Sequence, residues 1–165
     1  MRNLVFLHGF LGHPHEFNLL VDTFEKEFNC ISIDLNQGKC FTLKAQVDFV
    51  KIQLDQLEIK KAHFWGYSMG GRVLLELYKK YPEVCQSITL ESTSLGIGDI
   101  DEKNKRIKKD SEWAKLILSD PQSFLKKWYS QSPFDNFKKH KDFSFYESLR
   151  RKNLSSIHAQ MIIEA

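Results

Sequence analysis

The chain has 165 residues, of which 42% are hydrophobic and 27% are charged, and its formal net charge is +3. This length suits one globular domain with a sizeable core, and the mild charge argues against a nucleic-acid-binding protein. No segment approaches the roughly 18 apolar residues that a membrane-spanning helix needs, and none resembles a signal-peptide core, so we expect a cytoplasmic protein with no membrane contact.

Apolar runs of strand type alternate with helical patterns along the first hundred residues. The expected strands are Leu4 to Leu7, Cys30 to Leu35, Ala62 to Ser68 and Ser87 to Ser92. The expected helices are Pro14 to Phe28, a segment capped by Thr42 whose apolar stripe runs from Leu43 to Leu57, and Arg72 to Tyr81. The turn formers Asn36 and Gly38 close the second strand. This alternation predicts the α/β class, with a mostly parallel sheet and helices on both of its faces.

The character of the chain changes after Gly98. Residues 99–165 are rich in Lys, acidic and aromatic residues. They contain no strand-like run before the last few residues. Asp120 followed by Pro121 is typical of a helix cap and a first-turn proline. We therefore expect two parts, a core over residues 1–98 and a helical cap over residues 99–165 that lies on the active edge of the sheet.

The third expected strand ends in a motif that carries chemistry. Gly66-Tyr67-Ser68-Met69-Gly70 fits G-x-S-x-G, the nucleophile elbow, in which a serine occupies a strained turn between a strand and a helix. Ser68 is therefore the candidate catalytic residue. His8-Gly9-Phe10 ends the first strand, where the backbone N–H of Phe10 would join that of Met69 in an oxyanion hole. The alternative is a strand-turn-helix junction without chemistry.

Taken together, these features resemble the α/β-hydrolase fold. Within that superfamily the chain is most similar to the 2-succinyl-6-hydroxy-2,4-cyclohexadiene-1-carboxylate synthases of menaquinone biosynthesis. The narrower matches are the GYSMGGR elbow, the run with Arg106, Asp110 and Trp113, the run from Phe124 to Phe134, and Ser148 to Arg150. The resemblance implies a lyase that needs no cofactor. It would eliminate pyruvate from 2-succinyl-5-enolpyruvyl-6-hydroxy-3-cyclohexene-1-carboxylate, with the serine mediating proton removal.

An anionic small-molecule substrate calls for guanidinium groups, which stay charged and bind carboxylates bidentately. The resemblance maps the family's three anion-binding arginines onto Arg72, Arg106 and Arg150, in a chain with only five Arg among 24 basic residues. It also implies that Trp128 and Tyr129 face the substrate, although core packing explains these two aromatic residues equally well. Tyr67, beside the serine, is expected to line the pocket.

The cysteines do not indicate a metal site. Cys30, Cys40 and Cys85 form no C-x-x-C pair and no zinc spacing, so free thiols are expected.

The base that would activate Ser68 is not evident. In the family, the orienting Asp and the base His follow two further strands, which would lie beyond Ala165, and none of the six histidines has the spacing of a substitute. We therefore expect an N-terminal portion that lacks the last strands, with self-association through the open sheet edge as an option.

One loop departs from the superfamily. After the second strand, residues 34–40 read DLNQGKC where D-x-P-G-x-G-x-S is frequent. Two other functions remain open: a carboxylesterase or thioesterase that uses the same serine, and a non-catalytic fragment that binds an anionic ligand or a partner.

Overall fold

The computed structural model describes residues 1–37 and 42–164. The contacts divide the chain into two compact units. The core unit comprises Met1–Ile97 together with Glu164, and the helical unit comprises Gly98–Ile163. Gly38 and Cys40, expected to be a turn former and a free thiol, lie outside the described residues.

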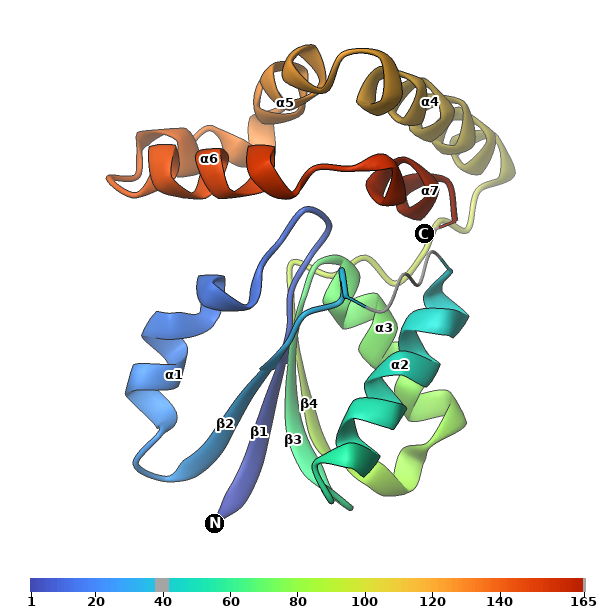
Figure 1. The fold of residues 1–165 in the computed structure, drawn as a ribbon. Helices are drawn as coiled ribbons and strands as arrows, with labels where there is room; N and C mark the ends of the chain where they lie inside the picture. The colour runs from blue at the N-terminus through green and yellow to red at the C-terminus, as the bar shows by residue number, and fades with distance from the viewer. Residues whose placement is uncertain (38–41, 165) are drawn as a thin grey trace. The chain divides into compact units, whose positions relative to one another are not determined.

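The core unit is built on a four-stranded sheet with the order β2-β1-β3-β4, in which every pairing is parallel (Figure 1). The strands are β1 (Arg2–Leu7), β2 (Phe28–Ile33), β3 (Ala62–Tyr67) and β4 (Cys85–Glu91). Val5, Phe6 and Leu7 of β1 are completely buried, because β1 is flanked by two strands and covered on both faces. The predicted α/β class and parallel sheet are confirmed.

Helices cover both faces of this sheet. The 3-10 turn η1 (Pro14–Phe17) and α1 (Asn18–Phe24) lie on one face, and α2 (Leu43–Gln56) and α3 (Met69–Lys80) lie on the other (Figure 1). A second 3-10 turn, η2 (Pro82–Val84), leads from α3 into β4. Thr42 caps α2 as predicted, since its hydroxyl accepts a hydrogen bond from the Ala45 N–H at 3.1 Å.

Several boundaries differ from the sequence-based expectation, most clearly those of the first two helices. The first helix ends at Phe24 and not at Phe28, because Phe28 opens β2 opposite Arg2 and packs its ring against His63 at 5.4 Å. The pairing of β2 with β1 therefore overrides the helical spacing. The apolar stripe of α2 is also shorter than expected, because Leu57 follows the helix and is 52% exposed.

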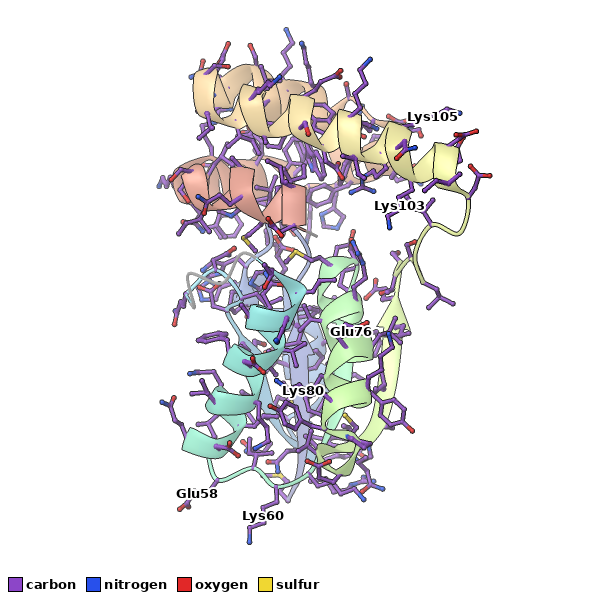
Figure 2. The ribbon with its side chains drawn as sticks, turned by 90° about the vertical axis from the view of Figure 1, so that its right-hand side faces the viewer. Glu58, Lys60, Glu76, Lys80, Lys103 and Lys105 are labelled. Carbon is purple, nitrogen blue, oxygen red and sulfur yellow. The ribbon has the colours of Figure 1, made fainter. Side chains whose placement is uncertain are left out.

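The outer surfaces of α2 and α3 carry ion pairs. Lys51 pairs with Asp55 along α2, Lys79 pairs with Glu76 along α3, and Lys80 joins α3 to Asp48 of α2. Glu76 and Lys80 are labelled on α3 in Figure 2. Among residues 1–37 and 42–164, no helix is both long and apolar enough to cross a membrane.

The helical unit consists of four α-helices and two 3-10 turns within its described residues. They are α4 (Ile100–Ser119), α5 (Pro121–Tyr129), η3 (Ser132–Phe134), η4 (Phe137–Lys139), α6 (Phe143–Asn153) and α7 (Ser156–Glu164). Asp120 caps α5 as predicted, since it accepts the Ser123 N–H at 3.0 Å, and Pro121 is the first helical residue. The long helix α4 was not foreseen, although Asp99 caps it in the same manner through the Glu102 N–H.

Gly70 allows α3 to approach β1. A Cβ atom on Gly70 would lie 2.2 Å from the Leu7 carbonyl oxygen, so Gly70→Ala is expected to lower the free energy of unfolding of the core unit by about 3 kcal/mol. Urea unfolding measures this change. Gly98→Ala is the matched control, since a Cβ there meets nothing within 4 Å. Equal losses in the two variants would contradict the packing argument.

Candidate active site

Ser68 occupies a strained turn between β3 and α3. Its backbone has φ 53° and ψ −113°, a positive φ that residues other than glycine rarely adopt. The turn is fixed from both sides. The Ser68 N–H donates to the Glu91 carbonyl of β4 at 2.9 Å, and the Ser68 carbonyl accepts the N–H groups of Gly71 and Arg72. The elbow thus presents Ser68 at the carboxyl end of β3, where parallel sheets bind ligands.

The turn that carries Phe10 lies directly beside this serine. A Cβ atom on Gly9 would come within 3.2 Å of the Ser68 Cβ and 3.0 Å of the Tyr67 ring. Met69 is the first residue of α3, so its N–H has no acceptor within the helix. The structure therefore brings Ser68, Met69 and the Phe10 turn to one edge of the sheet, which is the arrangement that an oxyanion hole requires.

Arg72 and Tyr67 belong to the same edge. Arg72 lies in the first turn of α3, where its N–H donates to the Ser68 carbonyl at 3.3 Å. Tyr67 is the last residue of β3, and it packs against the cluster formed by Leu4, Phe6 and Phe17. Both residues are half-buried, so the Arg72 guanidinium is partly open to solvent. Arg72 is also the arginine nearest in sequence to the elbow.

No base for Ser68 is found within residues 1–37 and 42–97. None of the described side chains there hydrogen-bonds the Ser68 hydroxyl, and the four histidines have other contacts. His63 contacts the Ser87 hydroxyl at 2.8 Å, and the His13 ring accepts the His15 N–H at 3.2 Å. The candidate nucleophile Ser68 therefore lies in the core unit without a hydrogen-bonded base among these residues.

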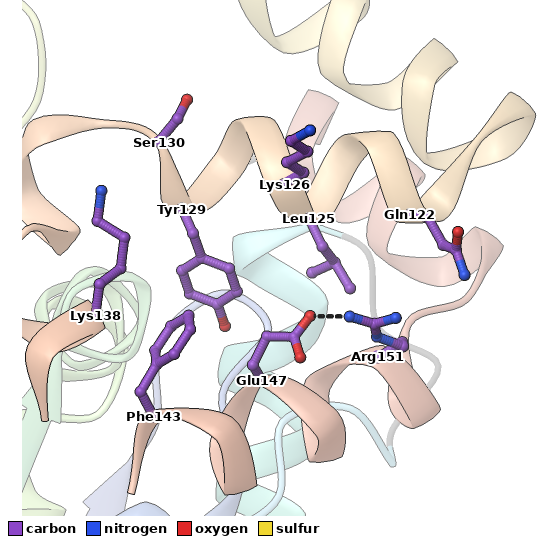
Figure 3. A pocket seen from close by; sticks show the side chains of 9 residues that line it. All are labelled: Gln122, Leu125, Lys126, Tyr129, Ser130, Lys138, Phe143, Glu147 and Arg151. Carbon is purple, nitrogen blue, oxygen red and sulfur yellow. Dashed lines mark hydrogen bonds and ion pairs between the residues drawn. The ribbon is translucent and has the colours of Figure 1, made fainter. Parts of the chain in front are cut away.

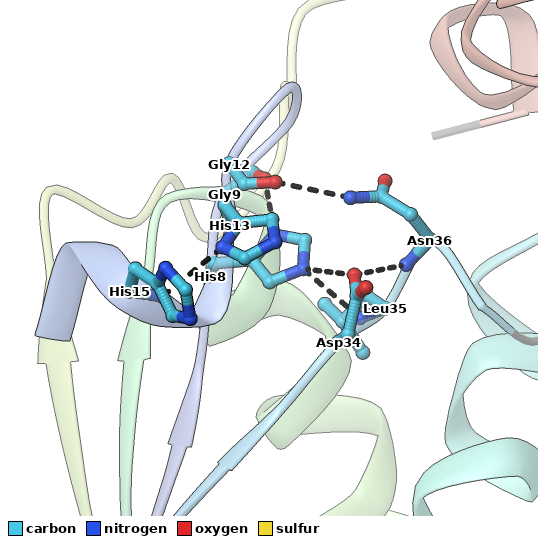
Figure 4. A network of polar contacts seen from close by, with 8 residues as sticks. All are labelled: His8, Gly9, Gly12, His13, His15, Asp34, Leu35 and Asn36. Atoms are coloured by element: carbon cyan, nitrogen blue, oxygen red, sulfur yellow. Dashed lines mark hydrogen bonds and ion pairs between the residues drawn. The ribbon is translucent and has the colours of Figure 1, made fainter. Parts of the chain in front are cut away.

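A polar network that the sequence did not reveal surrounds the buried His8 (Figure 4). His8 Nε2 accepts the Leu35 N–H at 2.9 Å, which places the ring proton on Nδ1, where it is donated to the Gly9 carbonyl at 2.8 Å. Asp34 Oδ1 lies 3.2 Å from His8 Nε2 and accepts the Asn36 N–H at 3.0 Å. Only when Nε2 carries a proton does it donate to Asp34.

Asp34 remains acidic in this network. Burial alone would raise the pKa of its carboxyl group, but the His8 ring, whenever its Nε2 carries a proton, and the Asn36 N–H hold that pKa below its ordinary value. A negatively charged Asp34 is therefore an acceptor over the whole neutral range. Its hydrogen bond from the Asn36 N–H holds the loop after β2 in shape.

The two candidate arginines of the helical unit, Arg106 and Arg150, are held by neighbouring side chains of the same unit. In α4, Arg106 Nε donates to Asp110 Oδ2 at 2.6 Å, one helical turn away. In α6, Arg150 is only 8% exposed, and its Nη1 donates to the Tyr129 hydroxyl at 3.0 Å. The Arg150 guanidinium also lies 5.4 Å from the centre of the Phe137 ring. Both arginines are thus oriented, Arg106 by a carboxylate and Arg150 by aromatic groups.

The cap aromatics pack into a core of their own. Trp128 contacts the rings of Trp113, Phe124 and Phe134 at centroid distances of 5.8, 5.6 and 5.8 Å. Tyr129 is 4% exposed, yet it also lines a cavity of about 480 Å³ within the helical unit (Figure 3). This packing supports the structural explanation for Trp128, whereas Tyr129 has both a packing contact and a cavity wall.

The thiols show no metal-binding arrangement. Cys30 and Cys85 are free, as predicted, and burial raises the pKa of the Cys85 thiol to about 11. Across the described part of the chain, no cluster of three or more His, Cys, Asp or Glu residues is placed to hold a metal ion.

Residues 2–156 match the family described as alpha/beta hydrolase fold. With its parallel sheet and serine elbow, the chain belongs to the α/β-hydrolase fold family. A Haemophilus influenzae protein is 27% identical over 99% of this chain and 70% of its own length, and a Bacillus subtilis protein is 34% identical over 76% and 49%. Both are provisionally named 2-succinyl-6-hydroxy-2,4-cyclohexadiene-1-carboxylate synthase.

A solved structure is also similar to this chain over nearly its whole length. The structure of MenH from S. aureus aligns with a TM-score of 0.83 and 25% identity, covering 99% of this chain and 65% of that one. The chain therefore spans about half to 70% of the length of these similar proteins.

Proposed function

We propose that this chain supplies the serine, the oxyanion donors and the anion-binding arginines of a carbon–oxygen lyase. The lyase converts 2-succinyl-5-enolpyruvyl-6-hydroxy-3-cyclohexene-1-carboxylate into 2-succinyl-6-hydroxy-2,4-cyclohexadiene-1-carboxylate and pyruvate, a step of menaquinone biosynthesis. The observation that carries the proposal is the gathering of Ser68, the Phe10 turn and Arg72 at one edge of the sheet. The names of the similar proteins support it.

The chemistry fits these groups. Removal of a ring proton forms a ring double bond as the bond to the enolpyruvyl oxygen breaks, and the departing enolate takes up a proton to become pyruvate. Negative charge develops on oxygen during this elimination, and the N–H groups of Phe10 and Met69 would stabilise it. The substrate carboxylates are ionised at neutral pH and would bind Arg72 of the core unit, and Arg106 and Arg150 are proposed as further carboxylate-binding groups of the helical unit.

The base that activates Ser68 is proposed to come from polypeptide outside these 165 residues. Two observations support this. No described side chain of residues 1–97 hydrogen-bonds the Ser68 hydroxyl, and the similar proteins are longer than this chain. A serine hydroxyl is a weak nucleophile and a weak proton acceptor until a base is placed beside it.

A fusion experiment tests both proposals. The chain is prepared alone and joined to the C-terminal part of the Haemophilus influenzae protein that it does not span. Pyruvate release from the cyclohexene substrate is then followed with a coupled lactate dehydrogenase assay. We expect the fusion to release pyruvate about 100-fold faster or more, because general base catalysis contributes about 10²–10⁴-fold.

Each other outcome is informative. Equal rates for the chain alone and the fusion would contradict the external base. Absence of pyruvate from both preparations, together with an acyl-enzyme burst from an activated ester, would favour the carboxylesterase or thioesterase function. Absence of both activities would favour a non-catalytic binding fragment.

A further inference from the structure

The turn from Gly9 to Gly12 needs outside support to keep its shape. It is closed by the Gly12 N–H, which donates to the Gly9 carbonyl at 2.9 Å. Inside it, Leu11 is buried and has φ 61°, a conformation that is unfavourable for a residue with a branched side chain. Such a conformation persists only where surrounding contacts determine it. Phe10, the proposed oxyanion donor, lies within this turn.

Asn36 provides one of these contacts (Figure 4). Its side-chain Nδ2 donates to the Gly12 carbonyl at 3.0 Å, across 24 residues of sequence. The opposite amide orientation would set Oδ1 against the Gly12 oxygen, two acceptors in contact, so the hydrogen bond fixes which atom faces the turn. Since Asn36 is half-buried, this bond is partly shielded from competing water.

Asn36 is itself held in place. Its backbone N–H donates to Asp34 Oδ1 at 3.0 Å, and the adjacent Leu35 N–H donates to His8 Nε2. A series of hydrogen bonds therefore runs from the end of β2 to both sides of the Gly9–Gly12 turn. In the superfamily pattern D-x-P-G-x-G-x-S, a proline stands at the position of Asn36. Proline has neither a backbone N–H nor a side-chain amide, so it could make neither contact.

We infer that Asn36 is a positioning residue for the oxyanion hole, acting through the hydrogen bond from its side-chain amide to the Gly12 carbonyl. This inference rests on the proposed function insofar as it treats the Phe10 N–H as an oxyanion donor. A catalytic donor must be held within about 0.5 Å of its productive position. Loss of the Asn36 amide would remove the hydrogen bond that joins this turn to the loop after β2, so the Phe10 N–H would sample other orientations.

The test uses two variants and a matched control. Asn36→Leu keeps the branched shape and the number of side-chain heavy atoms without the amide, and Asn36→Ala removes the side chain beyond Cβ. Asn29→Ala is the control, because Asn29 also donates a side-chain hydrogen bond, to Asn3, but on the exposed surface of β1 and β2. Amide hydrogen exchange of Gly12 is measured by NMR in the 165-residue chain. Steady-state kinetics of pyruvate release are measured in the fusion protein.

We expect Gly12 exchange to rise about tenfold in both Asn36 variants and to stay unchanged in Asn29→Ala. In the fusion, kcat should fall about tenfold with KM unchanged, since only transition-state stabilisation is affected. Unchanged Gly12 exchange in both Asn36 variants would contradict the proposal that the Asn36 hydrogen bond holds the turn. Faster exchange with an unaltered kcat in an active fusion would overturn its catalytic role. If the wild-type fusion releases no pyruvate, the proposed function fails, while the exchange data still decide whether Asn36 holds the turn.

Discussion

Replacing Ser68 with alanine is expected to lower kcat for pyruvate release by the fusion protein by about 10³-fold or more. Removal of a serine nucleophile in enzymes of this kind costs several orders of magnitude, and binding and the oxyanion donors leave a residual rate. The substitution is structurally mild. The Ser68 side chain makes no capping hydrogen bond to α3, and alanine keeps the Cβ that the turn already accommodates. KM should therefore change little.

Ser87→Ala is the control for this experiment. Ser87 is an exposed serine on β4 whose hydroxyl contacts His63, so its loss removes a hydroxyl group from the same sheet without touching the elbow. We expect the control to keep the wild-type rate. A Ser68→Ala fusion that retains more than about a tenth of the wild-type kcat would show that another group removes the proton. Thermal unfolding of both variants confirms that the fold is intact.

Sequence patterns predicted the parts of both units that depend on local interactions. Thr42 and Asp120 each cap a helix through an N–H three residues further on, and a pattern of that length is readable in the chain. The G-x-S-x-G motif likewise specifies its own turn, including the positive φ of Ser68. The alternation of strands and helices predicted the parallel sheet, because short helical crossovers between strands allow few other topologies.

Long-range contacts were not predictable in the same way. The His8 network joins residues 26 to 27 positions apart, and nothing local distinguishes Asp34 from any other acidic residue after a strand. The burial of Arg150 against Tyr129 and Phe137 likewise depends on the packing of α5 and α6. Phe28 was assigned to the wrong element, since its place in β2 is set by pairing with Arg2. A motif therefore locates the candidate nucleophile, whereas the contacts around it depend on the fold.

The cap arginines illustrate what the resemblance alone leaves open. Arg106 already shares a carboxylate with its own helix, and Arg150 already contacts a hydroxyl group and two aromatic rings. Either could serve an anionic substrate or simply stabilise the helical unit. Arg72 differs from both, because its backbone is bonded to the Ser68 carbonyl and its helix begins at the elbow. Among the three, Arg72 therefore gives the sharpest test of an anionic substrate.

Arg72→Ala in the fusion protein is expected to lower kcat/KM for pyruvate release by roughly 100-fold. A hydrogen-bonded charge pair contributes about 1.5–3 kcal/mol, and every 1.4 kcal/mol corresponds to a factor of ten. Arg72→Lys keeps the charge but loses the planar fork, so a loss of about tenfold is expected. Arg2→Ala is the matched control, since Arg2 lies at the opposite end of β1 with a 65% exposed side chain and a distant 4.0 Å contact to Glu27.

A second substrate separates binding of the anion from damage to the serine site. Hydrolysis of a neutral activated ester by the same variants requires Ser68 and the oxyanion donors but offers no carboxylate for Arg72. The lyase proposal therefore predicts a selective effect, with ester hydrolysis changing less than about twofold while pyruvate release collapses. Equal losses with both substrates would mean that Arg72 supports the elbow through its helix. Unchanged pyruvate release in Arg72→Ala would remove the main argument for a polyanionic substrate and favour an esterase built on the same serine.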